Sequence, residues 1–261
     1  MRSTLVRRAV LTASAVSLAL LATACGSDKA DDKKADAKPS AAASSAAPAA
    51  AAKGKTDAEL TGLLVTQAEV PGYLVQTEAA TKLAKVDSTA VTTDKAACKV
   101  LVQSQALQKV GTPTGVARTA LGAKPKEPAA NASPEEKLEA IKNALGITTT
   151  MTGLSSYDGK GAEELLASVK AAGTACAGGF SATSEGDTTK YESVKPGPAV
   201  TGGDESVSLS LTVDLSDGDK GTILIAVTRK GSTAATFSSI SLTGEAEHPK
   251  ALIDTQVKKL G

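Results

Sequence analysis

The sequence predicts an α+β protein: a single domain with an antiparallel sheet, helices packed on one face of that sheet, and a C-terminal helix. Before Phe180 the apolar residues recur with the period of an amphipathic helix, as at Leu165, Leu166 and Val169. About 205 residues follow the polar N-terminal region, a length that suits one domain. After Phe180 the period becomes two, which indicates half-buried strands, and serine or threonine separates Val207, Leu209, Leu211 and Val213.

The first predicted helix begins at a capping box. Thr56-Asp57-Ala58-Glu59 has the required spacing, and Leu60, Leu63 and Leu64 follow on one helical face. Pro71-Gly72 then predicts a turn. In the rest of this first part we expect strands over 73–75, 116–123 and 147–157, and helices over 94–110, 133–146 and 161–172.

The second part of the domain reads as consecutive strands joined by tight turns. Asp217-Gly218-Asp219-Lys220-Gly221 has the composition of a hairpin turn. His248-Pro249 opens the C-terminal helix, whose apolar side carries Leu252, Ile253 and Val257. The strands are predicted over 188–194, 206–213, 222–229 and 233–242.

Residues 1–24 have the layout of an export signal. Arginines at 2, 7 and 8 form a basic head, and an apolar run of 13 residues over 9–21 follows it. That run is too short to span a bilayer of about 30 Å. Small residues surround Cys25, and 21–27 resembles a bacterial lipobox, with Ala22 as a mild departure from the usual leucine. An ordinary secretory signal that ends at a cysteine is the alternative, and the export route, Sec or twin-arginine, stays open.

The lipobox resemblance implies that Cys25 carries diacylglycerol and an acyl chain such as palmitate, and that it becomes the new N-terminus. The segment 26–55 consists almost entirely of Ala, Ser, Asp, Lys, Pro and Gly. Such a segment buries too little apolar surface to fold, so 25–55 is predicted to be a flexible tether that reaches roughly 30 Å. The globular domain is then 56–261, held on the extracytoplasmic face of the cell membrane.

The charge of the exported chain argues against binding to nucleic acid. Loss of three arginines with the signal leaves 26 of 29 basic side chains against 28 acidic ones, a formal charge of −2. A near-neutral chain has no electrostatic reason to bind nucleic acid or an anionic lipid surface. The predicted membrane partner is therefore reached through the lipid on Cys25.

The three cysteines predict a disulfide. If Cys25 is acylated, Cys98 and Cys176 remain as one pair in an oxidising compartment. The chain-entropy model assigns roughly 4–5 kcal/mol to a bond that closes a loop of about 78 residues. Two free thiols or part of a metal site are the alternatives, but neither cysteine has a second Cys or a His at ligand spacing.

The motifs of common enzymes are not found in this sequence. His248 is the single histidine, and its place just before a helix favours a structural role. Gly153-Leu154-Ser155-Ser156-Tyr157 lacks the second glycine of a nucleophile elbow. Asp214, Asp217 and Asp219 allow a calcium interpretation, but a hairpin turn explains them better. We therefore predict no catalytic residues, no metal site and no cofactor.

Leu63-Leu64, Val70-Pro71-Gly72-Tyr73, a cysteine in the next helix, and a second cysteine followed by Phe180 form a layout that resembles actinobacterial lipoproteins. It is similar also to the extracellular sensor domains of mycobacterial receptor Ser/Thr kinases. The resemblance implies a sensor-like domain that binds a ligand or partner without catalysis. Those kinase domains look richer in cysteine, and none of their binding residues maps onto a position here.

The scarce aromatic residues supply a hypothesis for the binding site. The chain has three tyrosines, two phenylalanines and no tryptophan. Tyr73, Tyr157 and Phe180 are expected to line a groove between the sheet and the helices. The ligand would be a small molecule, a lipid or a protein of the cell envelope. A cell-envelope hydrolase with unidentified catalytic residues is the alternative function, and a scaffold that holds something near the membrane is a third.

Overall fold

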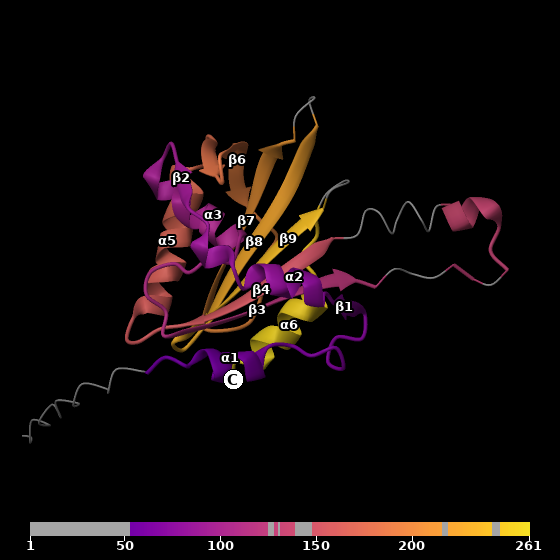
Figure 1. The fold of residues 1–261 in the computed structure, drawn as a ribbon, viewed down its shortest axis with the longest axis horizontal. Coiled ribbons are helices and arrows are strands. Elements are labelled where there is room, and N and C mark those ends of the chain that lie inside the picture. The colour runs from indigo at the N-terminus through magenta and orange to yellow at the C-terminus, as the bar shows by residue number, and fades with distance from the viewer. Residues whose placement is uncertain (1–52, 125–127, 130, 139–147, 216–218, 242–245) are drawn as a thin grey trace, which may run out of the picture. The chain divides into compact units, whose positions relative to one another are not determined.

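The computed structural model describes residues 53–124, 128–129, 131–138, 148–215, 219–241 and 246–261. Within these residues nine strands form one antiparallel sheet (Figure 1). In spatial order the strands are β1 (Tyr73–Val75), β3 (Gly115–Ala123), β4 (Thr149–Ser156), β9 (Thr233–Ser241), β8 (Lys220–Lys230), β7 (Glu205–Asp214), β6 (Asp187–Pro196), β5 (Phe180–Ser184) and β2 (Val91–Thr93).

Two-residue turns join β5 to β6 and β8 to β9, whereas 197–204 forms a longer connection between β6 and β7. The β5–β6 turn places Glu185 and Gly186 at positive φ, 54° and 93°, as a two-residue hairpin loop requires. The β7–β8 ladder pairs ten residues of β7 with β8, and β8 pairs in turn with β9. The predicted meander is therefore confirmed, and β4 lies against β9 to join it to the first part of the chain.

Three helices lie on one face of the sheet: α2 (Thr77–Leu83), α3 (Lys99–Gln105) and α5 (Gly161–Ala175). The largest hydrophobic cluster joins α3 and α5 to the sheet through side chains such as Ile223, Ile225 and Val227 of β8. Leu83 of α2 contacts Leu107 and Ala120 in a smaller cluster. Ala120 and Gly153 lie on the same face of the sheet, and the side chain of Leu107, which follows α3, packs against Gly153. The helix α2 therefore lies on the same side of the sheet as α3.

The opposite face is covered by α1 (Asp57–Leu63) and α6 (Lys250–Lys258). Leu60 of α1 and Ile253 of α6 pack with Ala226 and Phe237. Ala226 follows Ile225 directly in β8, and successive side chains of a strand point to opposite faces. The α+β class, the antiparallel sheet and the C-terminal helix are thus as predicted, but helices cover both faces rather than one.

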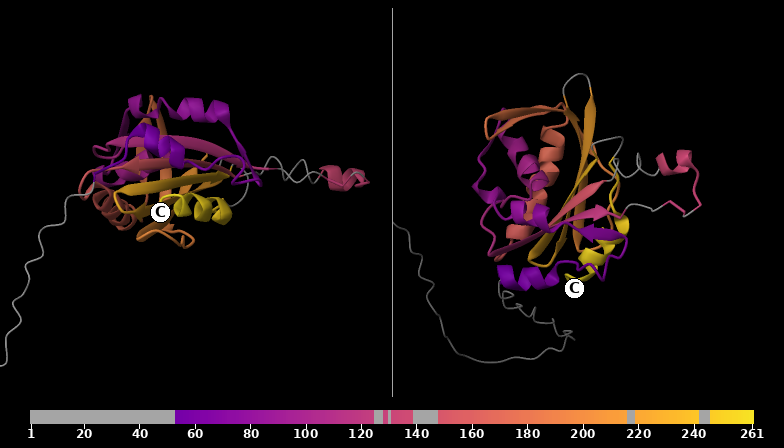
Figure 2. Two further views of the ribbon diagram at one scale, coloured as in Figure 1. Left: turned by 90° about the horizontal axis from the view of Figure 1, so that it is seen from below. Right: turned by 45° about the vertical axis from the view of Figure 1, so that its right-hand side comes forward.

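The pattern in β7 explains why the sequence suggested a single covered face. Its residues Leu209, Leu211 and Val213 are buried under α5, whereas its serines lie half-buried on the face of α6. In β8 both faces are buried, so its residues do not alternate. Figure 2 shows the sheet and its helices from two further directions. The half-exposed serines of β7 are Ser206, Ser208 and Ser210.

Several predicted elements are confirmed, and others differ. Thr56 and Glu59 form the capping box of α1. The helix predicted over 94–110 is shorter: η2 (Ala96–Cys98) precedes α3, and Leu107 has a φ of 56°, which ends the helix. Residues 134–138 are helical, and the rest of the predicted 133–146 helix lies outside the described residues. The elements that were not predicted are α2, η1 (Val86–Ser88), β2 and β5.

The packed part of the chain begins before the predicted boundary at residue 56. The Gly54 amide donates to Asp158 Oδ1 over 2.9 Å, and the Lys55 amide donates to Ser156 Oγ over 2.9 Å. These contacts fix the last residues of the predicted tether to the end of β4. Across the described part of the chain, no helix has both the length and the apolar character needed to cross a membrane.

Candidate ligand-binding pockets

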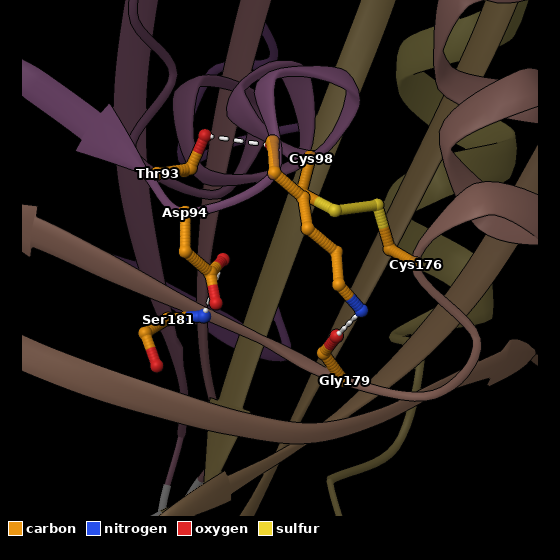
Figure 3. Close-up of a disulfide and its surroundings, with 7 residues drawn as sticks. Thr93, Asp94, Cys98, Cys176, Gly179 and Ser181 are labelled. Atoms are coloured by element: carbon orange, nitrogen blue, oxygen red, sulfur yellow. Dashed lines mark hydrogen bonds between the residues drawn. A yellow bond between two sulfur atoms is a disulfide. The ribbon is translucent and has the colours of Figure 1, made fainter.

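Cys98 and Cys176 form a disulfide between η2 and the end of α5 (Figure 3). Their Cα atoms lie 5.9 Å apart, and both side chains are completely buried. The predicted pairing is confirmed, and the alternatives of two free thiols or part of a metal site are set aside for this pair.

Hydrogen bonds hold the same two segments together. The Ser181 amide donates to Asp94 Oδ1 over 2.9 Å, and the Asp94 amide donates to the Ser181 carbonyl over 3.1 Å. Lys95 Nζ donates to the Gly179 carbonyl over 2.5 Å. The bond between Cys98 and Cys176 is therefore one part of a larger clamp that ties 94–98 to 176–181.

The three aromatic residues expected to line one groove lie in two hydrophobic clusters. Tyr157 and Phe180 belong to the cluster under α5, whereas Tyr73 packs beside a separate one that contains Leu121 and Leu252. Phe180 stacks on Tyr191 with ring centroids 4.4 Å apart, so its ring is a core element. The structure therefore does not bring the three rings to one surface.

Tyr157 forms the floor of a pocket of about 490 Å³ beside the start of α5. Its hydroxyl donates to the Val110 carbonyl over 3.1 Å, and burial raises its pKa to about 12. A Cβ at Gly161 would lie 2.8 Å from the Tyr157 ring, so glycine permits this close packing. The other walls, which are mainly polar, include Thr112, Asp158, Lys160, Glu164 and Ser168.

A second pocket, of about 450 Å³, lies between the β6–β7 connection and the start of α6. We call it the His248 pocket, after the histidine in its wall. Val200 and Ile253 connect this pocket to the hydrophobic cluster under α6. Its lining residues are Pro198, Ala199, Val200, Thr201, Ala246, Glu247, His248, Lys250, Ile253 and Asp254.

The two ring nitrogens of His248 have different surroundings. Nε2 lies 2.8 Å from Ser208 Oγ on β7, whereas Nδ1 is buried and, among the residues that the structure describes, has no hydrogen-bond partner. Burial lowers the pKa of the imidazole to about 4, so the ring is neutral at pH 7. A buried nitrogen without a hydrogen-bond partner costs roughly 1–3 kcal/mol, so Nδ1 keeps an unused hydrogen-bonding capacity in a residue that lines this pocket.

Sequence reasoning assigned His248 a structural place before a helix but missed both Ser208 and the pocket. Ser208 is one of several serines in β7, and 198–201 is an ordinary loop sequence. Forty residues separate Ser208 from His248, and only the fold brings them together. The sequence therefore held no local signal for this site.

Two of the aspartates considered for calcium, Asp214 and Asp219, lie at the two ends of the β7–β8 connection. The Leu215 amide donates to the Asp219 carbonyl over 2.9 Å, as expected for a tight hairpin. Asp217 lies outside the described residues. Among the described His, Cys, Asp and Glu residues, no group of three or more is placed to hold a metal ion.

No protein-family profile and no curated protein matches this chain. A solved structure, the extracellular domain of PknH from Mycobacterium tuberculosis, is similar with a TM-score of 0.45 and 11% sequence identity. The similarity covers 80% of this chain and 97% of that one.

Proposed function

We propose that this protein is an exported lipoprotein, anchored through acylated Cys25 on the extracytoplasmic face of the membrane, whose folded domain binds a ligand or partner without catalysis. The signal-like layout of 1–24 and the lipobox-like residues around Cys25 support the anchor. The Cys98–Cys176 disulfide agrees with an oxidising compartment, and it leaves Cys25 as the cysteine free for acylation.

The His248 pocket is the observation that carries the binding role. It has the size of a small-molecule site, and its walls combine apolar with polar and charged side chains. The buried Nδ1 of His248 supplies a polar group whose hydrogen-bonding capacity the described residues leave unused. A domain with such an unpartnered nitrogen in a residue that lines a pocket is suited to recognising a small molecule, a lipid headgroup or a side chain of an envelope protein.

The contact between Ser208 and His248 is an observation that favours the alternative function, a cell-envelope hydrolase. In a Ser-His-Asp site the carboxylate accepts from Nδ1 and orients the ring. Here Nδ1 has no such partner within the described residues, and Ser208 lies inside a strand rather than on an exposed turn. These features support binding over catalysis.

The anchor is tested by labelling cells with an alkyne analogue of palmitate. We expect the full chain to take up the label and Cys25→Ala to lose it, while both forms retain the Cys98–Cys176 bond. Equal labelling of both forms would show that the lipid is attached elsewhere, and unlabelled wild type would overturn the anchor.

The binding role is tested by native mass spectrometry of the mature chain carrying Cys25→Ser, purified from an exporting host. A discrete non-covalent adduct, or a co-purifying envelope protein lost in a His248 variant, supports binding. Hydrolysis of envelope esters or amides that is abolished by Ser208→Ala and by His248→Ala would instead establish the hydrolase.

A further inference from the structure

We propose that the His248 pocket binds a small amphiphile with an apolar body and an uncharged hydroxyl head, and that this hydroxyl pairs with Nδ1 of His248. The inference rests on the proposed binding function and names the ligand class for one of its pockets. It follows from three properties of the pocket: its apolar floor, its unpartnered ring nitrogen and its charge.

The floor of the pocket suits an apolar body. Ile253 and Ala246 are buried, and Val200 is half-buried against the cluster under α6. Pro198 and Ala199 complete the apolar part from the β6–β7 connection. A ligand that covers these side chains removes apolar surface from water, and this transfer favours binding in proportion to the area covered.

The ring nitrogen suits a hydroxyl group. Because Ser208 Oγ can donate to Nε2 or accept from it, Nδ1 is either a donor or an acceptor, according to the tautomer. A hydroxyl complements both states, since it carries one donor and two acceptor lone pairs. Amines and carboxylates, when charged, complement only one of them.

The charges around the pocket disfavour an anionic head. Glu247 and Asp254 are acidic and Lys250 is basic, so these wall residues sum to a formal charge of −1. Lys250 Nζ lies 2.8 Å from Asp254 Oδ2 and is already paired. The imidazole, which burial holds in the neutral form, adds no positive charge at pH 7. An uncharged head meets neither repulsion nor the cost of losing its hydration as an ion.

Access of a ligand to Nδ1 requires a local movement, because this atom is buried in the present conformation. Nδ1 is closed to water in this conformation, whereas Pro198, Ala199 and Thr201 are exposed at the surface. A ligand bound in the pocket should therefore shift the resonances of 198–201, which line it, together with those of the His248 ring.

The test uses the mature chain with Cys25→Ser, without a histidine tag, so that His248 is the one histidine in the sample. The probes are 1-octanol, octanoate and octylamine, which share a chain and differ in the charge of the head. Titration followed by ¹H–¹⁵N spectra of the imidazole reports the state of Nδ1 directly. We expect 1-octanol to shift the Nδ1 resonance and to bind about tenfold more tightly than either charged probe.

Two pairs of variants distinguish binding in the His248 pocket from general effects of a substitution on the protein. His248→Phe removes Nδ1 and should weaken 1-octanol binding about tenfold. Ser208→Ala removes the Nε2 contact, keeps Nδ1, and should bind 1-octanol nearly as well as wild type. Ala199→Leu narrows the His248 pocket and should weaken binding, whereas Ser168→Leu alters the Tyr157 pocket and should not.

Each other outcome overturns the inference in a recognisable way. Tighter binding of octanoate or octylamine would overturn the uncharged head. Binding that Ser168→Leu abolishes would place the ligand in the Tyr157 pocket, leaving the proposed binding function intact. No binding of any probe would overturn the ligand class, and the adduct measurement on exported protein would then decide separately whether the domain binds anything.

Discussion

The side chain of Gln256 holds the backbone at Val65. Its Oε1 accepts from the Val65 amide over 3.0 Å, and its Nε2 donates to the Leu63 carbonyl over 2.8 Å. Gln256 is completely buried, so water does not replace either bond if the amide is lost. One side chain of α6 thus satisfies the irregular backbone that follows α1, and it joins the two helices that cover this face of the sheet.

Gln256→Leu, which replaces the buried amide with an apolar group of similar size, should therefore destabilise the fold strongly. It leaves the Val65 amide and the Leu63 carbonyl without partners, and we expect a loss of about 3 kcal/mol in the free energy of unfolding. Urea unfolding of the mature chain with Cys25→Ser measures this. Lys250→Met, which removes an exposed ion pair with Asp254 on the same helix, is the control and should cost less than about 1 kcal/mol. Equal effects of the two changes would contradict this account.

Removal of the disulfide should cost about 4–5 kcal/mol in the chain-entropy model, because the bond closes a separation of 78 residues. The double change Cys98→Ala with Cys176→Ala is compared with wild type by urea unfolding. Asp94→Ala should cost more in that double variant than in the oxidised protein, because the bond to Ser181 holds the same two segments. Additive losses in the free energy of unfolding would show that the disulfide and the Asp94–Ser181 bond stabilise the fold independently.

The sequence predicts the long elements of this fold well, because their signals are local. The capping box at Thr56 and the alternation along β7 each follow from residues near one another. By contrast, β2 has three residues and pairs with β5, whose own sequence is polar and short. These short strands are held together by the clamp between 94–98 and 176–181, so no local sequence pattern predicts them.

The candidate site was less predictable than the fold. Scarcity of aromatic residues suggested that Phe180 was kept for a ligand, but its ring stacks on Tyr191 inside the core. For His248 the sequence showed only its place just before a helix, whereas in the structure burial lowers the pKa of its ring to about 4. Burial and the contact with Ser208 depend on segments distant in sequence, which composition and spacing do not report.

Gln67 protects the edge of the sheet, and its removal should promote self-association. Its amide Nε2 donates to the Tyr73 carbonyl over 2.5 Å, and its Oε1 accepts from the Val75 amide over 3.1 Å. These backbone groups lie on the outer side of β1, because Gln76 and Lys124 continue the ladder with β3 on the other side. Gln67 therefore occupies the place of a neighbouring strand, and an uncovered edge is a template for another chain.

We expect Gln67→Ala to sediment partly as dimers or larger species at concentrations where wild type is monomeric. Leu74 and Val75, which are exposed on β1, would add apolar contact between the paired edges. Gln103→Ala, a change of the same kind on α3, is the matched control and should not associate. Identical sedimentation of both variants would show that the short strand β1 is not a pairing edge.

Protonation of His248 should destabilise the fold as the pH falls. The pKa of the ring is about 4 in the folded protein against 6.5 for an unperturbed histidine. Between these values the unfolded chain binds more protons than the folded one, so stability is fully present above pH 6.5 and declines as the pH falls toward 4. This decline is a consequence of burying a neutral ring, and it disappears if the ring is removed.

The decisive comparison is between pH 7.5 and pH 5.5, above the range in which most carboxylates titrate. We expect the urea midpoint of wild type to fall across this interval and that of His248→Gln to fall less. The imidazole spectrum should show a neutral ring at pH 5.5 in the folded protein. A ring that protonates near pH 6.5 would mean that His248 is open to water, and the unpartnered Nδ1 would then have solvent to pair with rather than a ligand.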